Sequence, residues 1–406
     1  MKSIASCTAI IVILFCVSCK KDAETKKDFK KGTYAYDSAF LTKYDSSIIE
    51  LKDESGSARV LISPTWQGRV MTSTSTGPEG ASYGWINYDL LASGKKKKQF
   101  NPVGGEERLW LGPEGGQFSV YFSHGDTFNI NNWQVPPEID TIPFKPQVGS
   151  GAQAMFAAEA KLKNYKGTEF NIFIERRVRL LRTPETESLL GAKIPQGVQA
   201  VAYETLNRLE NKSGNDWKKE NGLLSIWLLG MMTPSDSTIV IIPFHPGDNA
   251  RSQINTTYFG QIPADRLMIK DSILFFRCDG RYRSKIGLPP TIAKPLAASF
   301  DFSRNILTVI IFPVNEDEMY VNSKWEIQKD PYSGDVVNSY NDGPLTNGDQ
   351  LGPFYEVESS SSVKELKRSE SFSYIQITSH FEGDFEGLND LAKKVLGVDL
   401  EDVRRF

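Results

Sequence analysis

The sequence contains little cysteine and histidine, and it has no excess of basic residues. Of its four cysteines three lie near the start, and the remaining one is Cys278. One thiol cannot form an internal disulfide, and one cysteine with three histidines cannot build a cysteine-rich zinc site. The formal net charge of −3 argues against nucleic acid as a partner, because phosphate binding needs a basic surface. Stability must therefore come from a hydrophobic core, for which 406 residues with 40% hydrophobic content provide enough material.

Two short catalytic and binding motifs are also missing. The chain has no phosphate-binding P-loop and no His-Glu-x-x-His, so nucleotide-binding and zincin functions gain no support. The only dense basic cluster is Lys95–Lys98, which follows a Ser-Gly pair and is interpreted as a solvated loop. We expect no required cofactor.

The N-terminus carries an apolar run, Ile10–Val17, which is too short to span a bilayer. Ser18 then precedes Cys19, and the sequence turns charged immediately afterwards. This pattern resembles the lipobox of bacterial lipoproteins. The resemblance implies cleavage before Cys19, lipid attachment to its sulfur, and anchoring to a membrane of the cell envelope, with the protein periplasmic or surface-exposed. The alternative is a conventional secretory signal in which every cysteine of the leader is discarded.

The rest of the chain is organised as one domain of strands. We expect a signal peptide over 1–18, a flexible charged tether over 19–32 and a single domain over 33–406. Hydrophobic alternation predicts one late helix, Gly387–Leu396, and strands at Arg59–Ser63, Arg69–Thr74, Phe118–Phe122, Ala154–Leu162, Phe170–Leu181, Gln199–Leu209, Leu223–Leu229, Ser237–Ile242, Ser272–Arg277, Ile306–Phe312 and Ser371–Phe381. This content predicts an all-β protein, a large antiparallel β-sandwich with an open concave face. Long irregular stretches at 77–104 and 125–151 are expected to be functional.

The stretch Gly104–Phe122 is the first candidate for a binding site. It contains five glycines. Among them stand polar, charged and aromatic side chains, which are Glu106, Glu107, Arg108, Trp110, Glu114 and Gln117. Glycine weakens a strand, so this composition suggests backbone bent to present those side chains to a ligand. Indole faces and forked polar groups are suited to a sugar, and we expect Arg108, Trp110, Glu114 and Gln117 to contact it. A glycine-rich turn whose charges face water is the alternative.

Two later segments add candidate residues. Glu356 and Glu358 lie two apart in an extended run, so both project from one face of a sheet, where one carboxylate can raise the pKa of the other. One of them could instead bond only to backbone. Earlier in the chain, Trp325 precedes an Asp- and Asn-rich segment that either lines a cleft or forms a turn. Its candidate ligand contacts are Asn338, Asn341 and Asp342. The aspartates also leave room for a bound calcium ion, although no EF-hand spacing is present.

The order of several motifs is similar to that of the galactose mutarotase-like (aldose 1-epimerase) superfamily, in a bacterial lipoprotein branch. The motifs are Pro64–Met71, Gly105–Trp110, Ala202–Trp227 and Tyr355–Tyr374, which together span most of the domain. The resemblance implies the family's β-supersandwich and a carbohydrate as ligand. It also implies that Arg108 and Arg69 contact the sugar and that Glu358, with Glu356 as neighbour, is the catalytic base.

One feature of the family is absent. The strand Leu223–Trp227 lacks the histidine that protonates the ring oxygen in aldose 1-epimerases, and His124 in a His-Gly pair is the remaining catalytic candidate. Ring opening needs both an acid and a base. Three hypotheses therefore stay open: an enzyme acting at or near the anomeric carbon as an isomerase, lyase or hydrolase, a non-catalytic carbohydrate-binding lipoprotein, and a structural envelope lipoprotein.

Overall fold

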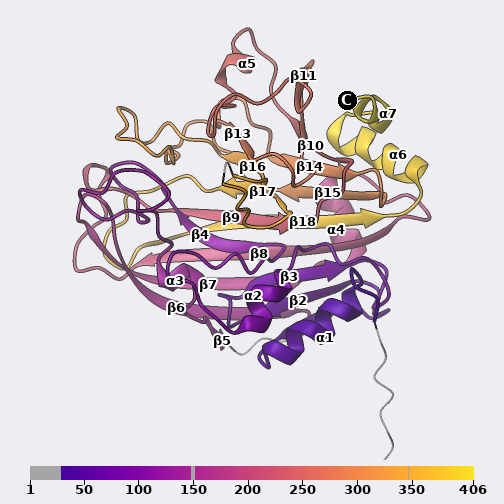
Figure 1. Ribbon diagram of the computed structural model, residues 1–406, viewed down its shortest axis with the longest axis horizontal. Coiled ribbons are helices and arrows are strands. Elements are labelled where there is room, and N and C mark those ends of the chain that lie inside the picture. Colours follow the sequence, from indigo (N-terminus) through magenta and orange to yellow (C-terminus); the bar gives the residue numbers. More distant parts are fainter. Residues whose placement is uncertain (1–28, 148–150, 346) are drawn as a thin grey trace, which may run out of the picture.

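The protein is built from three antiparallel β-sheets, and the computed structural model describes residues 29–147, 151–345 and 347–406. The expected all-β architecture is confirmed (Figure 1). A three-stranded sheet contains β1 (Ile49–Lys52), β2 (Arg59–Ser63) and β3 (Arg69–Thr74). A five-stranded sheet has the order β13 (Ser284–Leu288), β16 (Val337–Asn341), β17 (Tyr355–Ser360), β9 (Ser225–Met232) and β4 (Arg108–Gly112).

The third sheet is the largest and packs against the five-stranded sheet. Its ten strands lie in the order β11 (Leu267–Lys270), β12 (Ile273–Arg277), β10 (Thr238–Pro243), β14 (Leu296–Asp301), β15 (Ile306–Ile311), β18 (Ser371–Glu382), β8 (Gln199–Asn211), β7 (Glu169–Leu180), β6 (Gln153–Lys163) and β5 (Lys145–Gln147). Strand β7 shows why the sequence forms this sheet. Its residues alternate between a buried and a more exposed position along the whole strand, so one face packs on the core and the other faces solvent.

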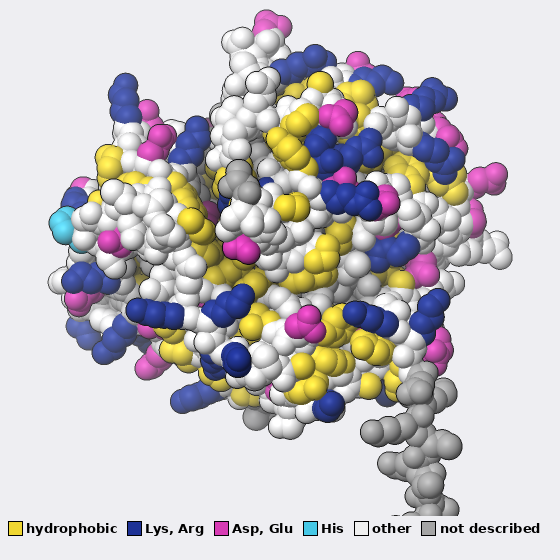
Figure 2. Space-filling view, in the orientation of Figure 1, with side chains coloured by type: hydrophobic (Ala, Val, Ile, Leu, Met, Phe, Trp, Pro, Cys, Tyr) yellow, Lys and Arg dark blue, Asp and Glu magenta, His cyan; other side chains and the backbone are white. Residues whose placement is uncertain are grey.

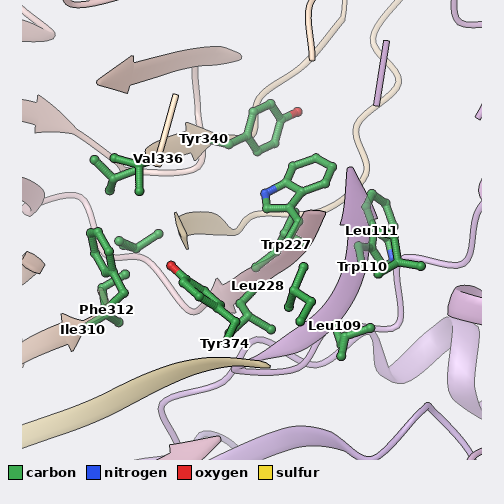
Figure 3. Close-up of a cluster of buried hydrophobic side chains, with 14 of the residues drawn as sticks. Leu109, Trp110, Leu111, Trp227, Leu228, Ile310, Phe312, Val336, Tyr340 and Tyr374 are labelled. Atoms are coloured by element: carbon green, nitrogen blue, oxygen red, sulfur yellow. The ribbon is translucent and has the colours of Figure 1, made fainter. Parts of the chain in front are cut away.

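The main core lies between the five-stranded and the ten-stranded sheets. The Tyr355 and Ser299 hydroxyl groups, one from each sheet, lie 2.8 Å apart across it. Figure 3 shows Leu228 of β9 on the same side of its strand as Tyr374 of the large sheet, while Trp227 points the opposite way. Successive residues of a strand point to opposite faces. The five-stranded sheet therefore has an inward apolar face and an outward face that can present other chemistry.

Helices cover the ends of the sandwich. They are α1 (Tyr34–Tyr44), α2 (Tyr88–Ser93), α3 (Pro137–Asp140), α4 (Thr183–Leu190), α5 (Ala250–Gln253), α6 (Phe385–Leu396) and α7 (Leu400–Arg404), with a 3₁₀ turn at Lys219–Asn221. In Figure 1 α6 and α7 lie at the right, where they pack on β10, β14, β15 and β18. Within the described residues, no helix is both long enough and apolar enough to cross a membrane.

The helix predicted over Gly387–Leu396 is confirmed as part of α6. It begins after Asp384, whose carboxylate accepts a 2.8 Å hydrogen bond from the Gly387 N–H. The sequence analysis did not predict α1 or α4. Helix α1 begins at the N-cap residue Thr33 and contains several tyrosines, a residue type that favours strands. Its packing on β2 and β3 outweighs that preference.

The strand predicted at Phe118–Phe122 is wrong. This segment is irregular, and its turn closes with a hydrogen bond from the Ser119 N–H to the Gly116 carbonyl. Its large side chains are buried among other aromatic rings, so the apolar pattern reflects burial of a loop. The strand in this region is β4, which precedes the glycine pair at 115 and 116.

Two acidic residues before β4 bind inside the sandwich. Glu107 accepts a 2.9 Å bond from Arg176 of β7, and both side chains are 0% exposed. Glu106 accepts from the Ser73 hydroxyl at 2.7 Å and lies 2.7 Å from Nε2 of His380. Removing one partner of a buried pair is strongly destabilising, so these residues hold the segment before β4 against the large sheet.

Candidate functional site

The outward face of the five-stranded sheet collects polar and aromatic side chains from every strand. The pairing register places Asn338 opposite Glu358, Glu358 opposite Leu229, and Leu229 opposite Arg108. One row along, Lys285 pairs with Tyr340, which pairs with Glu356. Because residues two apart in a strand share a face, a continuous surface forms. We call it the outward face, and it comprises Arg108, Trp110, Trp227, Lys285, Asn338, Tyr340, Glu356 and Glu358.

Glu358 lies at the centre of the outward face and is fully buried. Its Oε2 accepts two hydrogen bonds, from Trp227 Nε1 at 3.0 Å and from Lys285 Nζ at 2.9 Å. Its Oε1 has no hydrogen-bond partner among the described residues. A cation and an indole N–H thus fix the carboxylate through one oxygen and leave the other able to accept a proton or a hydrogen bond.

Glu356 has a different environment, although it lies only two residues away. Arg108 donates from Nη2 to its Oε1 at 3.0 Å, and both side chains are nearly inaccessible. Burial raises the pKa of Glu356 to about 8, the charge of Glu358 adds to this, and Arg108 opposes it without cancelling it. The carboxyl of Glu356 is therefore pushed toward its protonated form, the form that a general acid needs.

Further charged groups surround this pair. Burial lowers the pKa of Lys285, but Glu358 and Glu114 outweigh it and raise the pKa overall, so Lys285 stays a cation. Burial raises the pKa of Glu114, and Glu358 adds to the increase. Burial also raises the pKa of Asp335 to about 6, against the opposing hydrogen bond that it accepts from the Tyr258 hydroxyl. The outward face is thus a mixture of fixed positive charges and carboxyls whose charge depends on their neighbours.

Aromatic rings enclose the polar groups. Trp110 is 2% exposed and packs against Phe100, Trp133 and Trp227 at centroid distances of 5.4–6.2 Å. Phe100 lies in the segment between α2 and β4 and Trp133 in the segment between β4 and α3, so these two connections contribute rings to the cover of the outward face. Trp325 is only partly buried and stacks on Trp133 at 6.1 Å with an interplanar angle of 24°. Among the indoles expected to contact a ligand, Trp325 is thus the more accessible one.

Arg69 extends the outward face onto β3. An isolated bridge pairs Val70 with Glu107, which places Arg69 and Arg108 side by side on the outward side. Arg69 is 1% exposed and donates from Nη1 to the Gly104 carbonyl at 2.8 Å. Glycine is required at position 105, because a Cβ there would lie 2.5 Å from Cδ of Arg69 and the backbone φ is +110°. The glycine-rich sequence before β4 therefore makes room for a buried guanidinium.

Unpartnered buried polar atoms are concentrated in this region. Of the twelve such side-chain atoms among the described residues, six belong to the outward face or lie against it. They are Nε of Arg69, Nε of Arg108, Nε1 of Trp110, Nε1 of Trp133, Oγ of Ser225 and Oε1 of Glu358. An unmade hydrogen bond at a buried polar group costs about 1–3 kcal/mol, so native structures contain few of them. Their grouping calls for a common explanation, which a bound polar ligand would provide.

The surface and its depressions can be followed in Figure 2. In the orientation of Figure 1, the molecule is hollowed between the loops at the left and the segment around β13, and hydrophobic side chains line the hollow. Two shallow depressions beside α1, lined by residues such as Tyr34 and Tyr44, share no lining residue with the outward face. Those depressions contain none of the paired acids and bases described above.

Some of the residues predicted from sequence lie at the edge of this site. Gln117 exchanges two hydrogen bonds with the Gln328 backbone, at 2.9 and 3.0 Å, and so fastens the loop that carries Trp325. Asn338 is on the outward face and donates to the Ile286 carbonyl at 3.2 Å. His124 is exposed, and its ring nitrogen lies 3.0 Å from the Tyr165 carbonyl. It makes no contact with the glutamate pair among the interactions of the described residues.

The two remaining predicted contacts are held by local hydrogen bonds. Asn341 accepts from the Gly280 N–H at 2.8 Å and donates to the Tyr282 carbonyl at 2.9 Å. Asp342 accepts from the Tyr340 hydroxyl at 2.6 Å and from the Gly352 N–H at 3.0 Å. No group of three or more His, Cys, Asp or Glu side chains within 29–147, 151–345 and 347–406 is arranged to hold a metal ion. The calcium ion for which the sequence left room stays a prediction.

Sequence reasoning missed three residues that complete the site. Lys285 was not among the predicted site residues, yet it forms the ion pair with Glu358. Trp227 was noted only within a motif, and Trp133 was not singled out. Alternation of Arg283 and Lys285 along an extended segment was the available signal for Lys285. No local signal indicated that β13 and β17 lie on either side of β16.

A comparison with models of protein families identifies the family of this chain. Residues 32–406 match the model of a family described as a family of unknown function, DUF6786. The chain belongs to this family. The match begins within three residues of α1 and includes the whole sandwich, so the outward face lies inside the region that defines DUF6786. No curated protein matches the sequence.

Solved structures show a similar arrangement of strands at low sequence identity. The Slr1438 protein from Synechocystis sp. PCC 6803 has a TM-score of 0.48 and 12% identity, over 83% of this chain and 96% of that one. A galactose mutarotase-like protein from Lactobacillus casei has a TM-score of 0.47 and 10% identity, over 82% of this chain and 99% of that one. A galactose mutarotase related enzyme from Lactobacillus acidophilus has a TM-score of 0.46 and 10% identity, over 83% of this chain and 98% of that one. These likenesses describe architecture, and the functional argument rests on the side chains.

Proposed function

We propose that the outward face binds a carbohydrate. The observation that carries this proposal is the group of buried polar atoms without partners at Arg69, Arg108, Trp110, Trp133 and Glu358. The four N–H groups among them need acceptors, whereas Oε1 of Glu358 needs a donor. A hydroxyl group is both donor and acceptor, and a sugar carries several hydroxyls on a rigid ring.

The aromatic surroundings favour the same class of ligand. Apolar C–H faces of a sugar ring stack on indoles, and Trp325 keeps part of its ring accessible beside Trp133. Small binding sites typically combine such apolar walls with a few well-placed polar groups. The outward face has this composition, with Lys285, Arg108 and the two glutamates as its polar groups.

Glu356 and Glu358 supply the parts of an acid–base reaction at the anomeric carbon. Oε1 of Glu358 would take the proton of the anomeric hydroxyl, and protonated Glu356 would give a proton to the ring oxygen as the ring C–O bond breaks. Ring closure on the other face reverses both transfers and restores both residues. In this scheme Glu356 replaces the missing strand histidine as the acid, and Lys285 holds the Glu358 carboxyl in place through Oε2. The alternative is a carbohydrate-binding protein without turnover.

Access to the outward face requires motion. Each unpartnered atom exposes less than 1 Å². One covering segment, residues 254–260, places the Tyr258 ring 5.6 Å from Lys285 Nζ and the Phe259 ring 5.9 Å from that of Tyr340. Phe259 is 41% exposed, and the segment is joined to the sheet by the hydrogen bond from the Tyr258 hydroxyl to Asp335 and by backbone bonds of 2.8 and 2.9 Å between Asn255 and Gly287. We expect it to move aside when a ligand enters.

Export and lipid anchoring belong to the same proposal and rest on the sequence alone. Cys19 and the leader lie outside the described residues, and the structure begins close to the end of the predicted tether. A lipid on Cys19 would hold the carbohydrate-binding domain at a membrane of the cell envelope.

A glycan array followed by calorimetric titration of the purified protein tests the binding proposal. The expected result is saturable binding of a defined sugar, reduced by Trp325→Ala. Turnover is tested separately by measuring exchange between anomers with NMR. Glu358→Gln should abolish exchange and retain binding, whereas Glu204→Gln on the large sheet serves as a matched control that changes neither. If the wild type binds a sugar but does not exchange its anomers, the enzyme hypothesis is rejected and the protein is a carbohydrate-binding protein without turnover. Absence of binding to any glycan would reject both.

A further inference from the structure

Arg69 is a buried cation without an acidic partner. Its Nη1 and Nη2 donate to neutral oxygens, the Gly104 carbonyl at 2.8 Å and the Gln67 side chain at 3.4 Å, and its Nε has no partner. It forms no ion pair with a carboxylate of the described residues. Arg176, with the same exposure of 1%, pairs with Glu107 at 2.9 Å. Burying an unneutralised charge is costly, and the effective penalty is several kcal/mol per ion.

A second guanidinium beside Arg69 increases this cost. Burial, together with the charge of Arg108, lowers the pKa of Arg69 to about 9, while Asp140 and Glu356 oppose the shift without forming ion pairs with it. Arg69 still carries its proton near neutral pH. Arg108 forms an ion pair with Glu356, and the charge of the neighbouring Glu358 favours protonation of that same carboxyl. Among the described residues, the two adjacent positive charges therefore have one carboxyl in ion-pair contact, that of Glu356, which is itself prone to protonation, while Asp140 acts on both only through electrostatic attraction without an ion pair.

The two guanidinium groups are also shaped to receive a ligand. Each has its Nε–H unpartnered, and each lies against an indole, with Arg108 4.0 Å from the ring centre of Trp110 and Arg69 6.0 Å from that of Trp66. Aromatic cover excludes water and strengthens an electrostatic interaction with whatever binds there. A neutral hydroxyl would satisfy one N–H and leave the charge uncompensated. An anion would satisfy both N–H groups and neutralise the charge.

We propose that the carbohydrate bound by the outward face carries an anionic substituent, a carboxylate or a phosphate, and that Nε–H of Arg69 and of Arg108 bind it together. This inference rests on the proposed function and narrows its substrate class to acidic sugars. An incoming anion near Arg108 also favours the protonated form of Glu356. At a pH near or above 8, where free Glu356 is largely ionised, binding is therefore coupled to uptake of a proton, and Glu356 is left in the form that can act as an acid.

The experiment compares matched neutral and acidic sugars on the full-length protein. The probes are D-galactose, D-galacturonate and D-galactose 6-phosphate, together with the corresponding glucose series, titrated at constant ionic strength. We expect at least one acidic member to bind at least tenfold more tightly than its neutral counterpart, with proton uptake measured by calorimetry in buffers of different ionisation enthalpy. Preference for the uronate identifies a carboxylate, and preference for the 6-phosphate identifies a phosphate.

Substitutions locate the effect. Arg69→Gln should reduce affinity for the acidic sugar by a larger factor than affinity for the neutral one, so that the two affinities become about equal. Arg208→Gln removes the same charge from the solvent side of the large sheet, where Arg208 pairs with Glu175, and should change neither affinity. Inorganic phosphate should raise the Tm of the wild type and not that of Arg69→Gln.

Two results overturn the inference. Neutral sugars binding as tightly as their acidic counterparts would refute the anionic substituent and leave carbohydrate binding intact. An equal loss of acidic affinity in Arg69→Gln and Arg208→Gln would show a general charge effect in place of a site. If no sugar of either kind binds, the proposed function fails and the inference fails with it.

Discussion

Replacing Arg69 and Arg176 by methionine, one at a time, separates a structural cation from one that awaits a ligand. Both residues are 1% exposed, and each donates to a backbone carbonyl, Arg69 to Gly104 and Arg176 to Gly68. They differ in their partners, because Arg176 is paired with Glu107 whereas Arg69 forms no ion pair with a described carboxylate. Methionine has a similar length and no charge, so both variants change the same property in equally buried surroundings.

The expected energies differ in size. Arg176→Met leaves Glu107 as a buried unpaired charge, which costs about 3–5 kcal/mol. Arg69→Met loses two hydrogen bonds made by a charged donor, worth about 1.5–3 kcal/mol each. It also removes an unneutralised guanidinium whose burial costs several kcal/mol, so these terms largely cancel. We expect Arg69→Met to lie within about 1–2 kcal/mol of the wild type, well above Arg176→Met in stability.

Urea unfolding followed by tryptophan fluorescence measures both values. The comparison is valid where the m-values of the variants agree with that of the wild type, because the midpoint shift then reports stability alone. If Arg69→Met unfolds as readily as Arg176→Met, Arg69 is needed by the fold and the reasoning about its uncompensated charge is wrong.

Three further predictions concern other parts of the molecule. The pKa of Glu356 is raised to about 8 in the folded protein, so the folded state keeps a proton that the unfolded state loses above about 4.5. The stabilisation contributed by Glu356 is therefore complete below about pH 4.5 and is lost as the pH rises toward 8. In urea unfolding at a series of pH values, the midpoint should fall over this range, and Glu356→Gln should remove that fall. An unchanged pH dependence in the variant would assign it to other groups. Trp110→Ala should lower stability by about 3–5 kcal/mol because the ring is buried, whereas Trp325→Ala should mainly weaken sugar binding, by about 1–2 kcal/mol; the reverse order in denaturation and titration would exchange their roles. Mass spectrometry of membrane-extracted protein should find the lipid on Cys19, and a mature N-terminus elsewhere would contradict the lipobox.

Local patterns in the sequence were enough to predict much of the fold. Strands β2 and β3 have the bounds that alternation predicted, and the spacing of Glu356 and Glu358 placed both on one face of β17. Phe118–Phe122 failed because a buried loop and a buried strand have the same composition when the partner strand is not known.

The candidate site was less predictable, because its contacts join distant parts of the chain. The ion pair between Lys285 and Glu358 spans 73 residues, and the pair between Arg108 and Glu356 spans 248. Neither separation leaves a mark in a single sequence. The isolation of Arg69 was equally hidden, since a counter-ion can be recognised as missing only when all its neighbours are known.

The alternation of faces along β17 has an evolutionary consequence. Tyr355 and Val357 point into the core, while Glu356 and Glu358 between and beside them point to the outward face. Selection for a new ligand can therefore act on every second residue of the strand, and selection for stability acts on the residues in between. A lineage with this sheet can change its chemistry one side chain at a time without rebuilding the core, so relatives that share the fold need not share a substrate.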